Sequence, residues 1–254
     1  MHHSTTTCIS RIVQAAMLGA LALALAACGG GDKSGQAASG APAASVAPPA
    51  GKMWSDVVVA TPDGGMQMGN PNAPIKLVEY GSLSCPHCAK LAQEGMQTLI
   101  DKYVNSGRVS YEFRSYAIHG VIDIPLTVLV RCDSPDAFFP LVEQIYANQD
   151  ALINRAEAGN DQAKAAANLT GGQRWVALGR AFGLTDFFAA RGLPVAKANA
   201  CLAKGDDAQK VADEAAKWSS AGIDSTPTLV INGSKTDIRT WAELEPALQR
   251  AGAR

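Results

Sequence analysis

The stretch GSLSCPHCAK holds two thiols, Cys85 and Cys88, with only Pro86 and His87 between them. Cysteines at this spacing can form a redox-active disulfide, supply half of a metal site, or simply begin a helix. A structural zinc site needs four ligands, usually from two such pairs, and the sequence has no second C-x-x-C. A c-type haem site needs histidine directly after the second cysteine, where this chain has Ala89. The redox interpretation is favoured, and we expect neither a metal nor a cofactor.

The surrounding sequence places Cys85 at the start of a helix. Residues 75–80 form a short apolar run typical of a buried strand, and helical spacing begins at Pro86. Unpaired N–H groups and the positive end of the helix would favour the Cys85 thiolate, and a protonated His87 would add positive charge. A stabilised thiolate leaves readily and makes the disulfide oxidising. Cys88, one turn further along, is expected to be the shielded, resolving thiol.

Two more positions suit thiol chemistry. Glu79 lies in the apolar run before the cysteines. Its carboxylate would either reach water at a strand end or be buried, with a raised pKa, and carry protons for Cys88. Pro227 starts the apolar segment TPTLVI, where a proline lacks the N–H that a strand donates. It either serves the site or merely begins a strand.

The elements that must position these residues form two groups. Residues 53–117 predict a hairpin followed by a strand, a helix and a parallel strand, and residues 222–254 predict two strands around an Asn-Gly turn and a last helix. Between them, residues 118–221 have almost continuous helical patterning. The prediction is an α/β thioredoxin fold that carries an inserted all-helical domain.

The start of the chain indicates export. Residues 1–27 contain Arg11 and then an apolar run that is too short to span a bilayer, as in a signal peptide. The sequence LAAC, ending at Cys28, is similar to a bacterial lipobox, in which the cysteine is acylated; an ordinary signal peptide is the alternative. Residues 28–52 are rich in Gly, Ala, Pro and Ser and predict a flexible tether. We expect a lipid-anchored periplasmic protein, with Gly29 favouring the outer membrane.

Charge and cysteine content narrow the class of protein further. The 254-residue chain has a formal net charge of −1 and no basic run, which argues against nucleic-acid binding. Beyond the redox pair, Cys132 and Cys201 fall within the helical block. In an oxidising compartment they form either a disulfide or two separate buried thiols. A bond between them would close a long loop and stabilise the fold by roughly 4 kcal/mol.

The segments NAPIKLVEYGSLSCPHC and TPTLVING, together with the helical insertion, resemble the DsbA family of bacterial exported thiol:disulfide oxidoreductases, and lipoprotein-type members in particular. The resemblance covers residues 53–254. It implies an oxidase that donates its Cys85–Cys88 disulfide to reduced exported proteins through a mixed disulfide at Cys85. It also implies a quinone-linked membrane partner that restores the bond.

The resemblance assigns further roles. It implies that Pro227 is cis and lies against the disulfide, that Thr226 pairs its backbone with an extended substrate, and that Glu79 matches the family's acid. Second cysteine pairs in other members support a structural or regulatory Cys132–Cys201 bond.

Two other functions stay open. Thr226 stands where the best-known member of the family has valine, as in several isomerases and reductases of the wider superfamily, so a reductase or isomerase is one alternative. The other is a lipid-anchored binding protein whose disulfide is merely structural. His119 follows the second predicted strand; it either lies near the active site or, more simply, is a loop residue.

Overall fold

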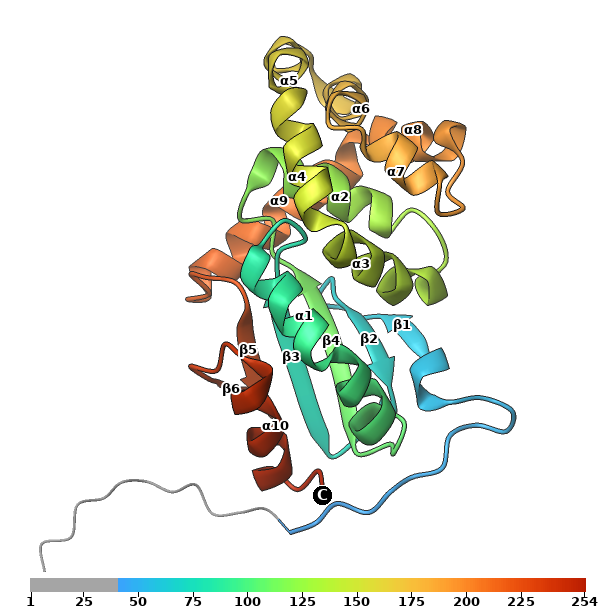
Figure 1. The fold of residues 1–254 in the computed structure, drawn as a ribbon, viewed down its shortest axis with the longest axis vertical. Coiled ribbons are helices and arrows are strands. Elements are labelled where there is room, and N and C mark those ends of the chain that lie inside the picture. Colours follow the sequence, from blue (N-terminus) through green and yellow to red (C-terminus); the bar gives the residue numbers. More distant parts are fainter. Residues whose placement is uncertain (1–40) are drawn as a thin grey trace, which may run out of the picture. The chain divides into compact units, whose positions relative to one another are not determined.

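The computed structural model describes residues 41–254. The predicted signal peptide (residues 1–27), Cys28 and the first part of the predicted tether lie outside the described residues. Across residues 41–254, none of the helices combines the length and the apolar character needed to cross a membrane. The described chain has the α/β thioredoxin fold with a helical insertion that the sequence predicts (Figure 1).

One six-stranded sheet, in the order β1-β2-β4-β3-β5-β6, organises the fold. Its two central strands, β3 and β4, are parallel, and all other neighbouring pairs are antiparallel. The strands are β1 (Val58–Ala60), β2 (Met66–Gly69), β3 (Ile75–Gly81), β4 (Val109–Ser115), β5 (Thr228–Ile231) and β6 (Ser234–Lys235). The predicted hairpins are β1–β2 and β5–β6, and the predicted parallel pair is β3–β4.

Strand β3 carries the candidate acid on its buried face. Along this strand Ile75, Leu77, Glu79 and Gly81 are buried, whereas the alternate residues are only half-buried. Successive side chains of a strand point to opposite faces, so Glu79 shares a face with the core residues Ile75 and Leu77. The register places it beside Phe113 of β4 and Leu229 of β5. A carboxyl group therefore occupies a core position in the centre of the sheet.

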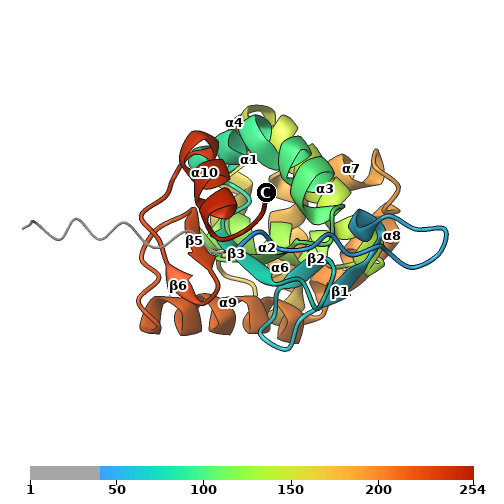
Figure 2. The same ribbon diagram turned by 90° about the horizontal axis from the view of Figure 1, so that it is seen from below.

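Helices cover the two faces of this sheet (Figure 2). Helix α1 (Pro86–Thr98) continues into a π-helical turn, η2 (Leu99–Val104), and lies with α10 (Trp241–Arg250) on one side. The two helices approach closely at Gly95, where an added Cβ would come within 2.2 Å of the Trp241 ring. On the other side, α9 (Gly205–Ser220) packs Trp218 edge-on against Tyr80 of β3, with ring centroids 5.2 Å apart.

The chain between β4 and β5 forms the predicted helical block. It consists of α2 (Gly120–Val130), η3 (Pro135–Ala137), α3 (Phe138–Ala147), α4 (Gln149–Ala158), α5 (Asn160–Ala166), α6 (Gly171–Ala181), α7 (Leu184–Ala189), α8 (Val195–Ala203) and α9 (Gly205–Ser220). Cys132, just after α2, and Cys201 of α8 are joined as a disulfide. The two cysteines are 69 positions apart, so the bond links the end of α2, the first helix of the block, to α8.

The segment before the short helix η1 (Trp54–Asp56) includes the described part of the predicted tether. There the N–H of Ala43 donates to the carbonyl of Gly252 (2.9 Å) and that of Val46 to the carbonyl of Ser106 (3.0 Å). Backbone groups make these contacts, and they need no apolar side chains. A composition that forms no core can therefore still lie along a folded surface. We call residues 43–46 the N-terminal strap.

Candidate active site

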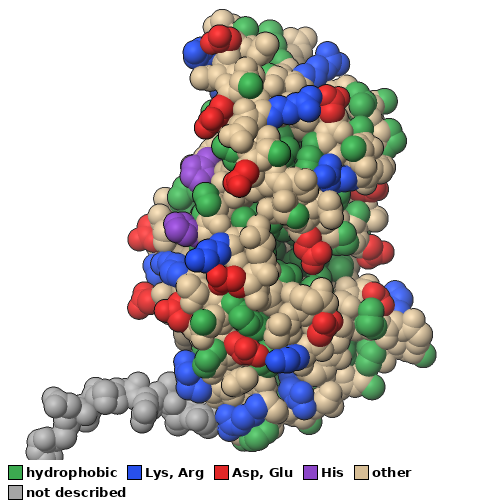
Figure 3. All heavy atoms as spheres, viewed as in Figure 1, with side chains coloured by type: hydrophobic (Ala, Val, Ile, Leu, Met, Phe, Trp, Pro, Cys, Tyr) green, Lys and Arg blue, Asp and Glu red, His purple; other side chains and the backbone are tan. Residues whose placement is uncertain are grey.

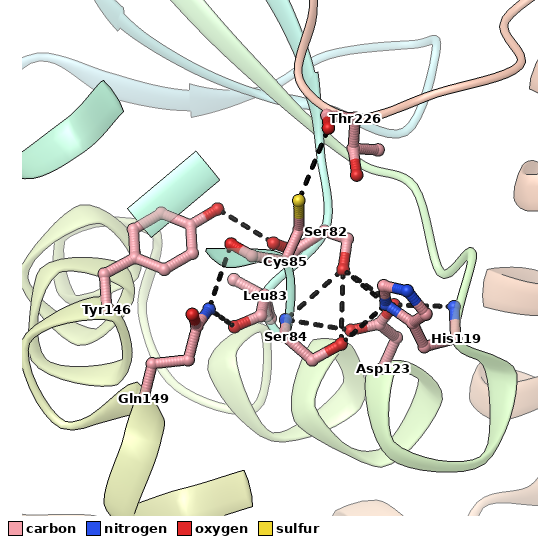
Figure 4. Close-up of polar contacts among 9 residues, drawn as sticks. All are labelled: Ser82, Leu83, Ser84, Cys85, His119, Asp123, Tyr146, Gln149 and Thr226. Atoms are coloured by element: carbon pink, nitrogen blue, oxygen red, sulfur yellow. Dashed lines mark hydrogen bonds and ion pairs between the residues drawn. The ribbon is translucent and has the colours of Figure 1, made fainter. Parts of the chain in front are cut away.

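Cys85 ends the loop that links strand β3 to helix α1 (Figure 4). It is the residue directly before the helix, and Pro86 occupies the first turn, where the missing N–H costs nothing. Its side chain is only 4% exposed, and its Sγ contacts the carbonyl oxygen of Thr226 at 3.3 Å. The helix start thus places one largely buried sulfur atom against the loop before β5.

The setting lowers the pKa of Cys85 to about 5. The largest cause is a hydrogen bond from the Cys88 thiol; burial opposes it, and the Thr226 side chain and the backbone N–H groups of Cys88 and His87 assist. At neutral pH the reduced Cys85 is therefore a thiolate. The residue His87 contributes through its backbone at the helix start, as predicted for unpaired N–H groups there.

Cys88 has the opposite character. It is completely buried, and desolvation, the Cys85 hydrogen bond and the charge of Glu79 raise its pKa well above the ordinary value. Both thiols are free in the structure. The two cysteines of one helical turn thus differ sharply in acidity. Cys85 suits the role of nucleophile and leaving group, and Cys88 suits the role of resolving thiol.

Glu79 lies behind the two cysteines. It is 4% exposed, and Tyr111 of β4 donates a hydrogen bond to its carboxylate at 2.7 Å. Burial raises the pKa of Glu79 to about 7, although the Tyr111 bond lowers it. Of the two settings weighed from the sequence, the structure has the buried acid. Its pKa allows it to gain and lose a proton near neutral pH.

The loop before β5 closes the other side of the site. The Thr226–Pro227 peptide bond is cis, and Thr228 fixes the turn by donating from its hydroxyl to the carbonyl of Ser225 at 2.7 Å. Thr226 thereby turns its carbonyl to Cys85, which lies 141 positions earlier. Pro86 and His87 are exposed at the rim.

The helical block holds the loop that leads into Cys85, a contribution that the sequence analysis missed. Tyr146 of α3 donates to the carbonyl of Ser82 at 3.1 Å, and Gln149 of α4 donates to the carbonyls of Leu83 at 2.9 Å and Cys85 at 3.2 Å (Figure 4). The carbonyls of Ser82 and Cys85 also accept backbone N–H groups, from Cys85 and Ala89, whereas the side chain of Gln149 satisfies the carbonyl of Leu83. The partners lie more than sixty positions apart, so no local pattern marks them.

A second set of missed residues comes from the start of α2. Asp123 and His119 contact Ser82 and Ser84 in the same loop (Figure 4). His119, which the sequence analysis placed either near the active site or simply in a loop, belongs to the surroundings of the site. A signal did exist, because Asp123 is an acid within the apolar run VIDIPLTVLV, as Glu79 is within IKLVEY.

The arrangement defines a class of site. It joins a low-pKa thiol at a helix start, a buried thiol one turn later, a buried acid and a cis-proline loop, all on a thioredoxin fold. Within residues 41–254, no cluster of three or more His, Cys, Asp or Glu side chains is placed to hold a metal ion. What the geometry can perform is thiol–disulfide exchange.

Comparison with known proteins agrees with this class. A family model described as Thioredoxin matches residues 61–250, and the chain belongs to that family. The structure of a protein-disulfide isomerase from Novosphingobium aromaticivorans is 28% identical, with a TM-score of 0.68, and the match covers 74% of this chain and 98% of that one. Wolbachia pipientis alpha-DsbA1 shares the fold at 19% identity, with a TM-score of 0.58 over 73% of this chain and 89% of that one. The predicted DsbA-type fold is confirmed.

A curated relative extends the comparison over a shorter stretch. A Rickettsia conorii protein with the provisional name protein-disulfide oxidoreductase is 33% identical over 89 residues, or 35% of this chain. The match spans only about a third of that relative, 32% of its length.

Proposed function

We propose that the protein is a thiol:disulfide oxidoreductase that acts mainly as an oxidase of exported proteins. The observation that carries the proposal is the unequal acidity of Cys85 and Cys88 at the start of α1. An environment that stabilises the Cys85 thiolate stabilises the reduced enzyme, which makes the Cys85–Cys88 disulfide a strong oxidant. The same inequality argues against the binding-protein alternative, because a structural disulfide needs no stabilised thiolate.

The first step is attack by a client thiolate on Sγ of Cys85. A client–Cys85 disulfide forms, the Cys85–Cys88 bond breaks, and the electron pair leaves on Cys88. Because burial raises the pKa of Cys88, this sulfur must take a proton. Glu79, whose pKa is about 7, is the buried group that supplies it.

The second step releases the client. A second thiolate of the same client attacks the client's sulfur atom in the mixed disulfide, and Cys85 leaves as a stabilised thiolate. The client has lost two electrons and gained a disulfide, and the enzyme holds the Cys85 thiolate and the Cys88 thiol. From the family resemblance, we propose that a quinone-linked membrane partner then reoxidises the pair.

Two surfaces beside Cys85 support an unfolded client as the substrate. The backbone of Thr226, next to the cis Pro227, faces the sulfur and suits pairing with an extended chain. On the opposite side, a groove of about 650 Å³ opens from Pro86 between α1 and the junction of α3 and α4, and a hollow is visible on this face (Figure 3). Its lining includes Lys90 and Asp150, which have opposite charges, so the groove suits a client segment with polar residues of either charge.

An isomerase is the second candidate. The Novosphingobium aromaticivorans neighbour carries that name, and Thr226 is the residue at which the sequence departs from the best-known oxidase. An isomerase must be kept reduced in the cell, whereas an oxidase must be kept oxidised. The low pKa of Cys85 favours the oxidase.

For location, we propose the bacterial periplasm. The support is the exported character of the DsbA family and the signal-like residues 1–27. Acylation at Cys28, and sorting of the anchored protein to the outer membrane, rest on the LAAC sequence and Gly29 alone.

The direction of the reaction can be tested with purified protein. Equilibration with glutathione gives the redox potential, and refolding of a reduced, unfolded client shows whether the disulfide is transferred. We expect an oxidising couple and rapid client oxidation. A couple as reducing as thioredoxin, about −270 mV, with no client oxidation, would overturn the oxidase assignment.

A further inference from the structure

The carboxylate of Asp123 has no part in the exchange steps, yet it is fixed beside the catalytic loop. It is 1% exposed and accepts hydrogen bonds from the hydroxyl of Ser82 (2.9 Å), the N–H of Ser84 (3.1 Å) and the N–H of His119 (3.0 Å). Two of these donors belong to the loop that ends at Cys85. The first turn of α2 thus clamps the approach to the reactive sulfur.

A buried carboxylate requires compensating positive charge. The N-terminus of α2 supplies part of it, and the imidazole of His119, whose Nδ1 lies 3.6 Å from Asp123, supplies the rest when protonated. His119 precedes α2 directly, and the charges that act on its ring are those of Asp123, in the first turn of that helix, and of Cys85, before α1. Hydrogen bonding to Asp123 and the charges of both groups raise the pKa of His119, while burial opposes them.

The contacts of the ring distinguish this cluster from a hydrolase triad. The hydroxyl of Ser84 lies 2.9 Å from Nδ1 of His119, the same nitrogen that faces Asp123. In a Ser-His-Asp triad the serine and the acid meet opposite ring nitrogens, so that a proton can pass through the ring. His119 therefore cannot activate Ser84 against a substrate; instead it contacts the residue that directly precedes Cys85.

We propose that His119 is a positioning residue of the thiol site: its imidazole, held by Ser84 and lying beside Asp123, takes up a proton when the disulfide is reduced, and the resulting imidazolium compensates the charge of the Cys85 thiolate. The inference deepens the proposed function and rests on it. It adds a second histidine to the site, on the opposite side of Cys85 from the groove. In the space-filling view, histidine side chains lie on the surface where the helical block meets the sheet domain (Figure 3).

The proton balance of the exchange gives this residue its role. Oxidation of two client thiols releases two electrons and two protons. The electrons break the Cys85–Cys88 bond, one proton goes to Cys88, and Cys85 remains a thiolate. The second proton is then held by the His119 ring, which keeps the new negative charge compensated within the site.

The direct test is an NMR titration of the imidazole protons in the oxidised and reduced forms of the unaltered protein. Because coupling between two sites is reciprocal, the pKa of His119 should be higher in the reduced form, by roughly half a unit for a partly exposed pair. Cys85→Ser should remove the difference between the two conditions. Equal His119 pKa values in the two forms would overturn the proposal.

Variants provide an independent measurement, the thiolate absorbance of Cys85 as a function of pH. His119→Gln should raise the Cys85 pKa, and His119→Lys, which keeps a positive charge, should restore the low value. Val121→Ala is the matched control, since Val121 is 50% exposed in the same first turn of α2. A Cys85 pKa that is the same in His119→Gln and in Val121→Ala would contradict the proposal.

Neither measurement uses a client protein or a reoxidant. If the protein fails to oxidise clients, the proposed oxidase function fails while the coupling between His119 and Cys85 is still measured. If clients are oxidised and the two pKa values are independent, only the role of His119 fails.

Discussion

Cys85 and Cys88 are both free at the start of one helix, whereas Cys132 and Cys201 lie 69 positions apart and are joined. Cys85 precedes α1, so the N–H groups of that helix face its sulfur. Cys132 follows α2, where the unpaired groups are carbonyls and the dipole is negative. A helix start stabilises a thiolate and a helix end opposes one.

The two pairs therefore differ in chemistry because of which end of a helix each occupies. The first pair exchanges its bond, and its surroundings favour the reduced form. The second pair ties the helical block together, and that block in turn holds the loop before Cys85 through Tyr146 and Gln149. The fixed disulfide thus supports the elements that position the reactive one.

The largest expected effect separates the pairs outright. Cys85→Ser should lower the rate of client oxidation by at least about a thousandfold, because no other described cysteine has a lowered pKa. The Cys132→Ser/Cys201→Ser double variant should keep most of the rate. Oxidation of a reduced client, followed by thiol counting, checks both. An equal loss in the double variant would show that the second pair also exchanges.

The next effect concerns stability. The Cys132→Ser/Cys201→Ser variant should unfold with a free energy lower by roughly 4 kcal/mol, because the bond closes a long loop in the unfolded chain. Urea unfolding followed by circular dichroism measures the difference. Cys88→Ser, compared with the reduced parent, controls for loss of a buried sulfur without loss of a cross-link. A difference below about 1 kcal/mol for the double variant would contradict a stapling role.

Glu79→Gln should slow formation of the mixed disulfide roughly a hundredfold, because the buried Cys88 sulfur that leaves in this step then lacks its proton source. In the parent protein Glu79 has a pKa of about 7 and loses its proton as the pH rises through 7. The proton transfer to Cys88 should therefore slow over that range. The variant should lack this dependence. Tyr111→Phe removes a bond that lowers the Glu79 pKa, so its midpoint should move to higher pH. Stopped-flow kinetics from pH 5 to 9 measures the rate of this step. Rate–pH profiles that superimpose for the parent and both variants would contradict the role of Glu79.

The smallest expected effect is at the rim. His87→Gln should make the Cys85–Cys88 couple more reducing, because a protonated His87 beside the thiolate favours the reduced form. The potential is measured against glutathione, with Lys90→Gln as a control for loss of an exposed positive charge on the same helix. An unchanged potential in His87→Gln would leave the backbone at the helix start as the source of the low Cys85 pKa.

Local patterns predicted the parts of this molecule that are built locally. The apolar run of β3, the proline after Cys85 and the Asn-Gly turn each carry their own signal, and the order of strands and helices follows from them. Glu79 could be singled out because an acid in an apolar run is unusual. Asp123 has the same signal and was missed, because its run reads as a helix far from the cysteines. Gln149 and Tyr146 carry no signal, since only the folded chain brings them to the loop that they hold.

The N-terminal strap has a consequence for how the enzyme meets its clients. Residues 43–46 bind the chain at Ser106 and Gly252, near the end of the sheet where β3 begins, and Cys85 lies beyond the end where β3 stops. The described chain therefore enters the fold at the end of the sheet that is remote from the thiol, and long or bulky clients can approach Cys85 from the opposite end without meeting the strap.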